Sequence, residues 1–161
     1  MKSLFLLLCF AAMAFCADSQ GVKMIITGVT AAEGEDVIAF ETSDTIAATN
    51  FSGGGGASTP VFEFVKIKKV KGVSTNELYK RSLSGLHLTE VKFEFYDEIA
   101  TLFYQVSIKD VTVNHFSYLA PECPGCFKLF HQVWFDYKQI EVTDISTGLV
   151  VRYNRATRVF Y

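Results

Sequence analysis

Three long stretches of alternating polarity in the second half of the chain limit the possible folds more than any other feature. In the first, Val91, Phe93 and Phe95 alternate with charged residues, and similar patterns run through residues 102–108 and 127–137. Because β-strand side chains point to opposite faces in turn, a period of two is typical of strands with one buried and one wet face. Shorter extended patterns cover residues 22–28, 37–42, 61–70 and 149–153. The sequence therefore predicts a fold dominated by β-strands.

The alternation changes phase at two places, and each change predicts a bend in a strand. Apolar residues shift from one parity to the other near Phe64–Val65 and again at Lys109–Asp110. Since strand side chains have a period of two, such a shift predicts a β-bulge or a tight bend. Barrels and strongly curved sheets turn corners in this way, so we expect a barrel-like domain.

One short helix is predicted between two of these strands. Ser74 and Glu77 match a capping box, in which the serine hydroxyl accepts from the third helical N–H and the glutamate reaches back to the cap. Gly85 marks the end of a helix of about three turns. The apolar stripe of this helix would consist of Leu78, Tyr79 and Leu83.

Length and composition are those of one domain with its own core. The chain has 161 residues, and single domains cluster at about 100–150 residues. Half of the residues are hydrophobic and fifteen are phenylalanine, so a sizeable core is possible without disulfide bonds. The formal net charge is −2 with both signs interspersed, which argues against a nucleic-acid or anionic-membrane partner.

The first sixteen residues have the pattern of an export signal. One positive charge precedes an apolar run that is too short to span a bilayer, for which about 20 residues are needed. Ala14 and Cys16 are the small residues expected before a cleavage site ahead of Ala17. We therefore interpret residues 1–16 as a signal peptide and residues 17–161 as a single secreted domain. An uncleaved anchor and a lipoprotein cysteine at Cys16 are the alternatives.

Cys123 and Cys126 lie outside the export signal and flank a Pro-Gly pair. In an oxidising compartment this spacing predicts a local disulfide bond that pins an exposed turn. So short a loop removes little chain entropy, and its stabilising effect should be small. Two alternatives stay open: a redox motif, which would need a following helix to lower the thiol pKa, and a zinc half-site. The further zinc ligands would have to come from His87, His115 and His131.

The other histidines and exposed aromatic residues have structural interpretations. His115 and His131 fall on otherwise apolar parities, which is typical of hydrogen-bonded core or edge residues. Trp134 and Tyr96 are predicted to face outward and to serve a contact surface, where aromatic residues are enriched. The carboxylates of the acidic loop at residues 31–36 are interpreted as a solvated turn, since the spacing of a calcium loop is missing.

The sequence lacks the arrangements that catalysis requires. Asp97 and Glu98 mark a hairpin turn, where adjacent carboxylates point apart. Ser117 lies near His115, but the Gly-x-Ser-x-Gly nucleophile elbow is missing. A hydrolase would rest on scattered histidines and carboxylates alone. We therefore expect no catalytic, cofactor-binding or metal-binding residues, and a protein that is not an enzyme.

Four consecutive glycines, Gly53, Gly54, Gly55 and Gly56, interrupt the strand patterns. Glycine carries no side chain to pack and enters positive φ freely, so the tract is irregular backbone between two elements. A phosphate loop is excluded, because no Lys-Ser or Lys-Thr closes the tract and a strand pattern follows it. The tract is either a flexible linker or a place where another chain approaches closely. Asn50 begins a glycosylation sequon just before it.

Taken in order, these motifs resemble those of the haemolysin-coregulated proteins, the Hcp tube subunits of bacterial type VI secretion. The similar segments are residues 24–29, 53–58, 64–66, 74–78 with Gly85, 104–111 and 135–140. The resemblance covers residues 22–154 in collinear order.

The resemblance implies a barrel of two β-sheets with one helix packed at its side and no catalytic residues. It also implies self-association, because family members form six-membered rings that stack into a hollow tube. The stacking loop of the family precedes the glycine tract, so Gly53 to Gly56 would belong to an assembly loop. Two features depart from the family pattern, the export signal and the sequon at Asn50. They leave a second hypothesis open, a monomeric extracellular binding protein or secreted effector built on the same barrel.

Overall fold

The computed structural model describes residues 21–42, 44–47, 59–119 and 128–161 of the chain. Within these residues the chain forms ten strands and one helix. The strands are β1 (Gly21–Ile26), β2 (Glu35–Glu41), β3 (Asp44–Ala47), β4 (Thr59–Phe62), β5 (Val65–Val70), β6 (Leu88–Tyr96), β7 (Leu102–Leu119), β8 (Phe130–Asp144), β9 (Leu149–Asn154) and β10 (Val159–Phe160). The helix is α2 (Thr75–Ser84).

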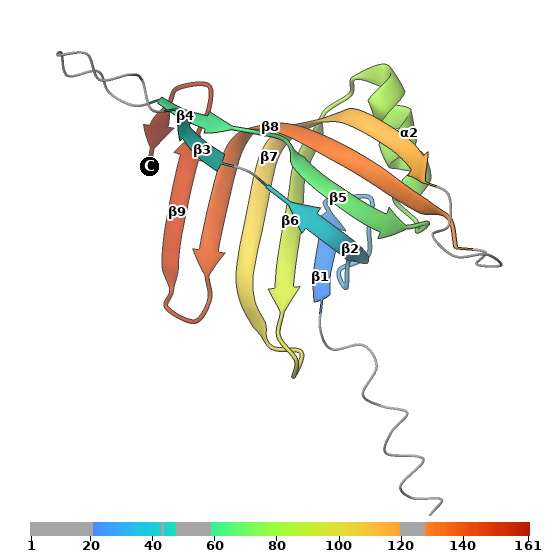
Figure 1. Cartoon of the computed structure of the whole chain (residues 1–161), viewed down its shortest axis with the longest axis horizontal. Coiled ribbons are helices and arrows are strands. Elements are labelled where there is room, and N and C mark those ends of the chain that lie inside the picture. Colours follow the sequence, from blue (N-terminus) through green and yellow to red (C-terminus); the bar gives the residue numbers. More distant parts are fainter. Residues whose placement is uncertain (1–20, 43, 48–58, 120–127) are drawn as a thin grey trace, which may run out of the picture.

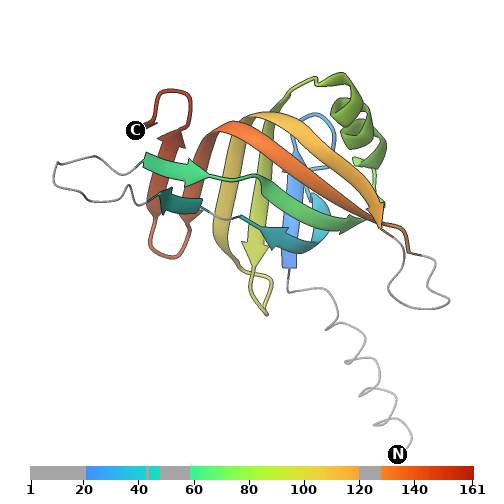
Figure 2. The ribbon, with the colours of Figure 1, turned by 45° about the horizontal axis from the view of Figure 1, so that its top comes forward.

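Six of the strands close into an antiparallel barrel. They pair in the order β8-β5-β2-β1-β6-β7, and β7 pairs with β8 to complete the ring. Figures 1 and 2 show these strands curving around a common interior, with α2 on the outside. The predicted β-dominated barrel with one short helix is confirmed.

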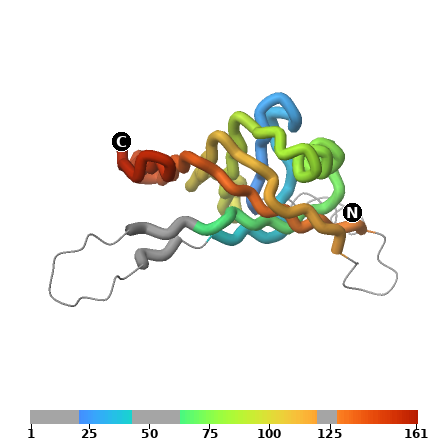
Figure 3. Tube along the Cα trace, turned by 90° about the horizontal axis from the view of Figure 1, so that it is seen from above, coloured from blue at the N-terminus to red at the C-terminus, as the bar shows by residue number. Residues whose placement is uncertain are grey.

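Strand β8 belongs both to the barrel and to an open extension. One of its edges pairs with β7 along the whole strand. The other edge is divided, because residues 130–135 pair with β5 and residues 139–144 pair with β9. β9 and β10 therefore leave the barrel, and they lie at the end of the molecule opposite α2 (Figures 1 and 3).

Apolar side chains from all six barrel strands fill the interior. Phe93 and Phe135 are fully buried, and their ring centroids lie 6.1 Å apart. Phe40 adds an edge-to-face contact with Phe93 at a centroid distance of 4.9 Å. Such aromatic pairs add about 0.5–1.5 kcal/mol beyond the area that they bury. The other fully buried apolar side chains are Met24, Ile26, Val65, Ile67, Leu78, Val91, Ile108, Val111 and Val133.

The first change of phase marks a boundary between two strands rather than a bend within one. Residues 61–70 belong to β4 and β5, which are separated by Glu63 and Phe64. β4 pairs with β3 in a separate two-stranded sheet, whereas β5 belongs to the barrel (Figure 2). The parity shifts because the chain passes from one sheet to the other at this point.

The second change of phase is confirmed, but its cause is not an inserted residue. Buried positions in β7 switch faces between Ile108 and Val111, while the register with β8 stays constant. Asp110 lies in this segment with a φ of +52°, a conformation that few residues other than glycine adopt. β7 does contain a bulge further along, where its register with β8 shifts between Val113 and His115.

The helix is confirmed in its extent, but most of its apolar stripe is exposed. Gly85 follows α2 with a φ of +67°, and its N–H donates to the carbonyl of Arg81, which is the expected end of a helix. Leu78 is buried against the barrel, whereas Tyr79 and Leu83 are exposed. The helix is therefore held by one buried leucine, by ring contacts of Tyr79 with β7 and by polar contacts at the helix start.

The predicted capping box is wrong. Ser74 has helical backbone angles, and its side chain makes no cap bond. The Ser74 hydroxyl donates instead to Glu35 Oε2 on β2 at 2.5 Å, and Glu77 forms an ion pair one turn along the helix. At the helix start, Thr75 Oγ1 accepts from the N–H of Gly72 at 2.9 Å. A carboxylate from a distant strand has replaced the local cap.

Candidate assembly surface

The extension formed by β9 and β10 carries exposed apolar side chains. Leu149 is 63% exposed and Phe160 is 64% exposed. Successive strand side chains point to opposite faces, so Leu149, Val151 and Phe160 lie on one face of the extension and Val150 and Val159 lie on the other. Exposed apolar side chains that gather on a protein surface often mark interaction sites. The exposed apolar residues of the extension, called the β9–β10 surface below, are Leu149, Val150, Val151, Val159, Phe160 and Tyr161.

Strand β9 also presents a free edge. It pairs with β8 over its full length, whereas β10 pairs only with Tyr153 and Asn154 near its end. Among the described residues, no strand pairs with the outer edge of residues 149–151. The backbone N–H and C=O groups of an open edge are a template for a strand from another chain.

Charged side chains hold the extension against the barrel. Arg152 Nε lies 2.6 Å from Glu141 Oε2 on β8. Arg155, in the turn between β9 and β10, lies 2.6 Å from the carboxylate of Asp136, and its guanidinium carbon sits 4.8 Å from the ring centroid of Tyr137. These contacts add to the backbone pairing of β9 with β8, which joins the extension to the barrel.

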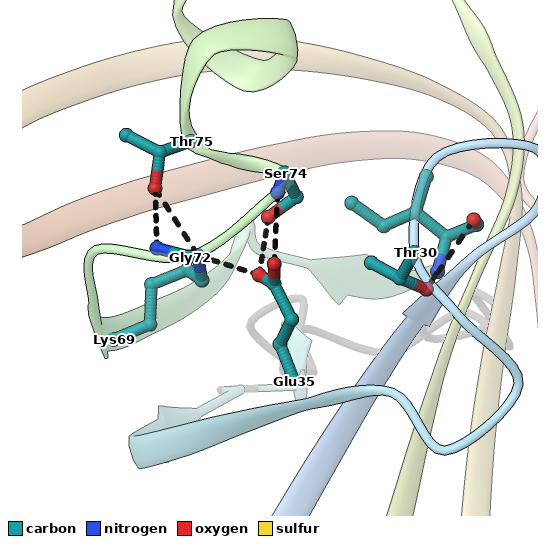
Figure 4. Close-up of polar contacts among 7 residues, drawn as sticks. Thr30, Glu35, Lys69, Gly72, Ser74 and Thr75 are labelled. Atoms are coloured by element: carbon teal, nitrogen blue, oxygen red, sulfur yellow. Dashed lines mark hydrogen bonds and ion pairs between the residues drawn. The ribbon is translucent and has the colours of Figure 1, made fainter.

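A second arrangement, which the sequence did not reveal, joins α2 to the barrel. Lys69 on β5 is buried, and its Nζ lies 2.6 Å from Glu35 Oε2. Glu35 also accepts from the backbone N–H and the hydroxyl of Ser74, at 2.8 and 2.5 Å (Figure 4). Lys69 Nζ reaches Oγ1 of Thr75 at 3.5 Å. We call Glu35, Lys69, Ser74 and Thr75 the helix anchor.

The helix anchor keeps the Glu35 carboxylate ionised. Burial raises the pKa of Glu35, but the hydrogen bonds from Lys69 and Ser74 outweigh it and hold the pKa below its ordinary value. Gly72 leaves room for this carboxylate, because a Cβ there would lie 2.6 Å from Glu35 Oε1. The predicted solvated turn at residues 31–36 is wrong for Glu35, whose side chain is only 11% exposed.

His131 is a core residue, as predicted, but it is not hydrogen-bonded. It is 1% exposed, and neither ring nitrogen has a hydrogen-bond partner among the described residues. Its ring packs against Phe116 and Tyr118, with centroid distances of 5.3 and 5.1 Å. Burial, and then the positive charges of Lys69 and Lys71, lower the pKa of His131 below its ordinary value.

Trp134 and Tyr96 offer less contact surface than predicted. Trp134 is half-buried, its ring stacks on Phe64, and its indole N–H is buried without a partner among the described residues. His115 is also half-buried, with its ring centroid 4.8 Å from that of Trp134, which fits the predicted edge position. Tyr96 is half-buried and donates its hydroxyl hydrogen to Glu94 Oε2 at 2.6 Å.

Of the remaining residues singled out in the sequence, Asp97 and Glu98 are described by the structure and the others are not. Asp97 and Glu98 lie in the turn between β6 and β7, as expected, and Asp97 accepts from the N–H groups of Ile99 and Thr101. Those outside the described residues are residues 1–16, Asn50, Gly53, Gly54, Gly55, Gly56, Cys123 and Cys126.

Across the described residues, no group of three or more His, Cys, Asp or Glu side chains is placed to hold a metal ion. In the same part of the chain, helices of the length and apolar character needed to cross a membrane are lacking.

Comparison with known proteins identifies the family. The family model described as the type VI secretion system effector Hcp matches residues 26–143. The chain belongs to this family. Hcp-family proteins are structural tube subunits without enzymatic activity, so the predicted structural, non-enzymatic class is confirmed. No curated protein sequence matches the chain significantly.

Solved structures show the same fold at low sequence identity. One described as a type six secretion system protein aligns with a TM-score of 0.75 and 12% identity, covering 89% of this chain and 100% of that one. Hcp1 from Salmonella typhimurium aligns with a TM-score of 0.73, 11% identity and coverage of 89% and 99%. The secreted protein Hcp3 from Pseudomonas aeruginosa aligns with a TM-score of 0.66 and 18% identity, covering 84% of this chain and 98% of that one. The Hcp family model ends before β9, so the β9–β10 surface lies beyond it.

Proposed function

We propose that this Hcp-family chain is a structural subunit that assembles with copies of itself into rings of six. The observation that carries the proposal is the β9–β10 surface, where exposed apolar side chains adjoin a free strand edge. Burial of apolar surface contributes about 25 cal/mol per Å². A strand from a neighbouring subunit would cover the apolar side chains and satisfy the open backbone groups together.

Ring closure places a further requirement on the contact. In a ring, each subunit uses one patch toward one neighbour and a different patch toward the other. The β9–β10 surface supplies one of these patches. Because a stable interface buries about 800 Å² per partner, adjoining parts of the barrel wall must take part as well.

Electron microscopy of the purified domain, residues 17–161, tests the proposal. We expect ring-shaped particles with a central hole and six-fold symmetry. Compact particles of single-subunit size at high protein concentration would contradict it. They would favour the second candidate, a monomeric extracellular binding protein or effector, which the export pattern and the sequon at Asn50 support.

We also propose that the tract Gly53 to Gly56 belongs to the assembly loop. Its four glycines have no Cβ, which permits close approach of a neighbouring backbone. Replacing Gly54 and Gly55 by valine should weaken subunit association more than it lowers the melting temperature, because valine adds bulk and resists positive φ. Oligomer mass and melting temperature, measured side by side on both proteins, check this. Equal association of the two proteins would identify the tract as a linker.

Export by a signal peptide is a further part of the proposal. Cleavage before Ala17 and oxidation of Cys123 with Cys126 should both appear in the intact mass of secreted protein. We expect the mass of residues 17–161 less two hydrogen atoms, with a sugar increment where the host glycosylates Asn50. A secreted product that retains Met1 would contradict the cleavage, and alkylation of both cysteines without reduction would contradict the disulfide.

A further inference from the structure

We propose that His131 is an acid-sensitive switch that releases α2 from the barrel. The inference rests on the position of His131 between two of the contacts that hold the helix, which Leu78 also holds, and it is independent of ring assembly. One contact is the helix anchor, and the other is a group of aromatic rings on β7 and α2.

The helix anchor lies directly beside His131. Lys69 and His131 face each other in the ladder between β5 and β8, and both are 1% exposed. Lys69 binds Glu35, which in turn holds the N–H and the hydroxyl of Ser74 at the start of α2 (Figure 4). A positive charge on His131 would therefore arise next to the ammonium group that orders the helix start.

The aromatic contact lies on the other side of the same ring. His131 packs against Phe116 and Tyr118 of β7. Tyr79 of α2 packs against the same two rings, with centroid distances of 5.5 and 6.1 Å. A charged imidazole in this apolar site would lose its hydration without gaining a partner, which disfavours the packed arrangement. Both contacts of α2 therefore depend on a neutral His131.

The charged and titratable groups around His131 do not offer it a free counter-charge. Lys69 comes from β5, Lys71 follows that strand directly, Tyr118 comes from β7, and Glu35 comes from β2. Glu35 is the only carboxylate in this set, and Lys69 and Ser74 already engage both of its oxygens. Protonation of His131 would add a second positive charge beside Lys69 with one carboxylate to balance both.

The direction of the pH effect follows from proton binding. The pKa of His131 is lowered in the packed state, so this state binds fewer protons than the state in which α2 has detached. The packed state is therefore fully favoured above the ordinary histidine pKa of about 6.5. It loses stability as the pH falls below that value, by up to about tenfold in the opening equilibrium per pH unit.

Hydrogen exchange of the α2 amides at pH 7.5 and pH 5.5 tests the switch, after correction for the intrinsic pH dependence of exchange. In the wild-type protein we expect up to about tenfold more opening of α2 at pH 5.5, with β6 unchanged. His131→Phe, which keeps an aromatic ring but cannot be protonated, should open equally at both pH values. His115→Gln, which removes a half-buried histidine from β7, should behave as the wild type does.

Two outcomes would overturn the switch. The first is equal opening of α2 at both pH values in the wild type, and the second is an unchanged pH response in His131→Phe. A proton NMR titration of the wild type keeps the test valid where the variant fails to fold. We expect the His131 ring and the α2 amides to titrate together below pH 6.5, and separate titration of the two would refute the coupling.

Discussion

Replacing Glu35 by glutamine should lower the free energy of unfolding by about 3–5 kcal/mol, the usual cost of removing one partner from a buried ion pair. Glutamine keeps the shape of the side chain, but it leaves the buried ammonium group of Lys69 without a counter-charge. It also weakens the acceptor that binds Ser74 at the start of α2. Urea unfolding followed by circular dichroism measures the loss.

The neighbouring residue provides a matched control for this substitution. Asp36 pairs with Lys23, but its side chain is 76% exposed. Exposed ion pairs contribute about 0.2–1 kcal/mol, so Asp36→Asn should change stability by no more than that. Equal losses for the two variants would show that burial of the Glu35–Lys69 pair has no special role. The stability from Glu35 should also disappear in acid, as the pH falls through its lowered pKa.

Placing two carboxylates on the β9 edge, Leu149→Asp with Val151→Asp, should dissociate the proposed ring and leave the subunit folded. Both side chains are exposed in the subunit, so the change removes little of its core. Burying an apolar side chain is worth about 1.5–3 kcal/mol, so association should weaken at least tenfold for each site, since tenfold corresponds to about 1.4 kcal/mol. Sedimentation velocity across a concentration series measures the association, and the melting temperature reports the fold.

Ile99 offers the control for this pair of substitutions. It is 80% exposed in the turn between β6 and β7 and is not one of the residues of the β9–β10 surface. Ile99→Asp adds a carboxylate at an exposed apolar position and should leave association unchanged. If Ile99→Asp dissociates the protein as strongly as the β9 variant does, the added negative charge itself weakens association. The β9 edge would then not be the contact between subunits.

Local patterns in the sequence predicted most of the elements, because strands and helices depend on near neighbours. The period of two located β6, β7 and β8, and Gly85 located the end of α2. The parity shift near residue 64 was visible, but its cause depends on which strands pair, and β4 pairs outside the barrel. Register across the barrel is a property of distant segments that no local pattern contains.

The candidate site could be predicted only in part, for two physical reasons. The contact between Glu35 and Ser74 joins residues 39 positions apart, and Glu35 occurs in an acidic stretch that looks solvated. In β9, the continuous apolar run at residues 149–151 is typical of a buried strand, yet these side chains are exposed. Their exposure follows from the divided edge of β8. Residues 130–135 of β8 pair with β5 inside the barrel, whereas residues 139–144 pair with β9, which lies outside it.

The mass of the purified domain in solution, measured by light scattering, tests self-assembly through the β9–β10 surface most directly. For residues 17–161 we predict a mass of six subunits that falls to one subunit in the Leu149→Asp, Val151→Asp variant. A single-subunit mass for the wild type at high concentration would contradict ring formation. A six-subunit mass in both proteins would contradict the role of the β9 edge.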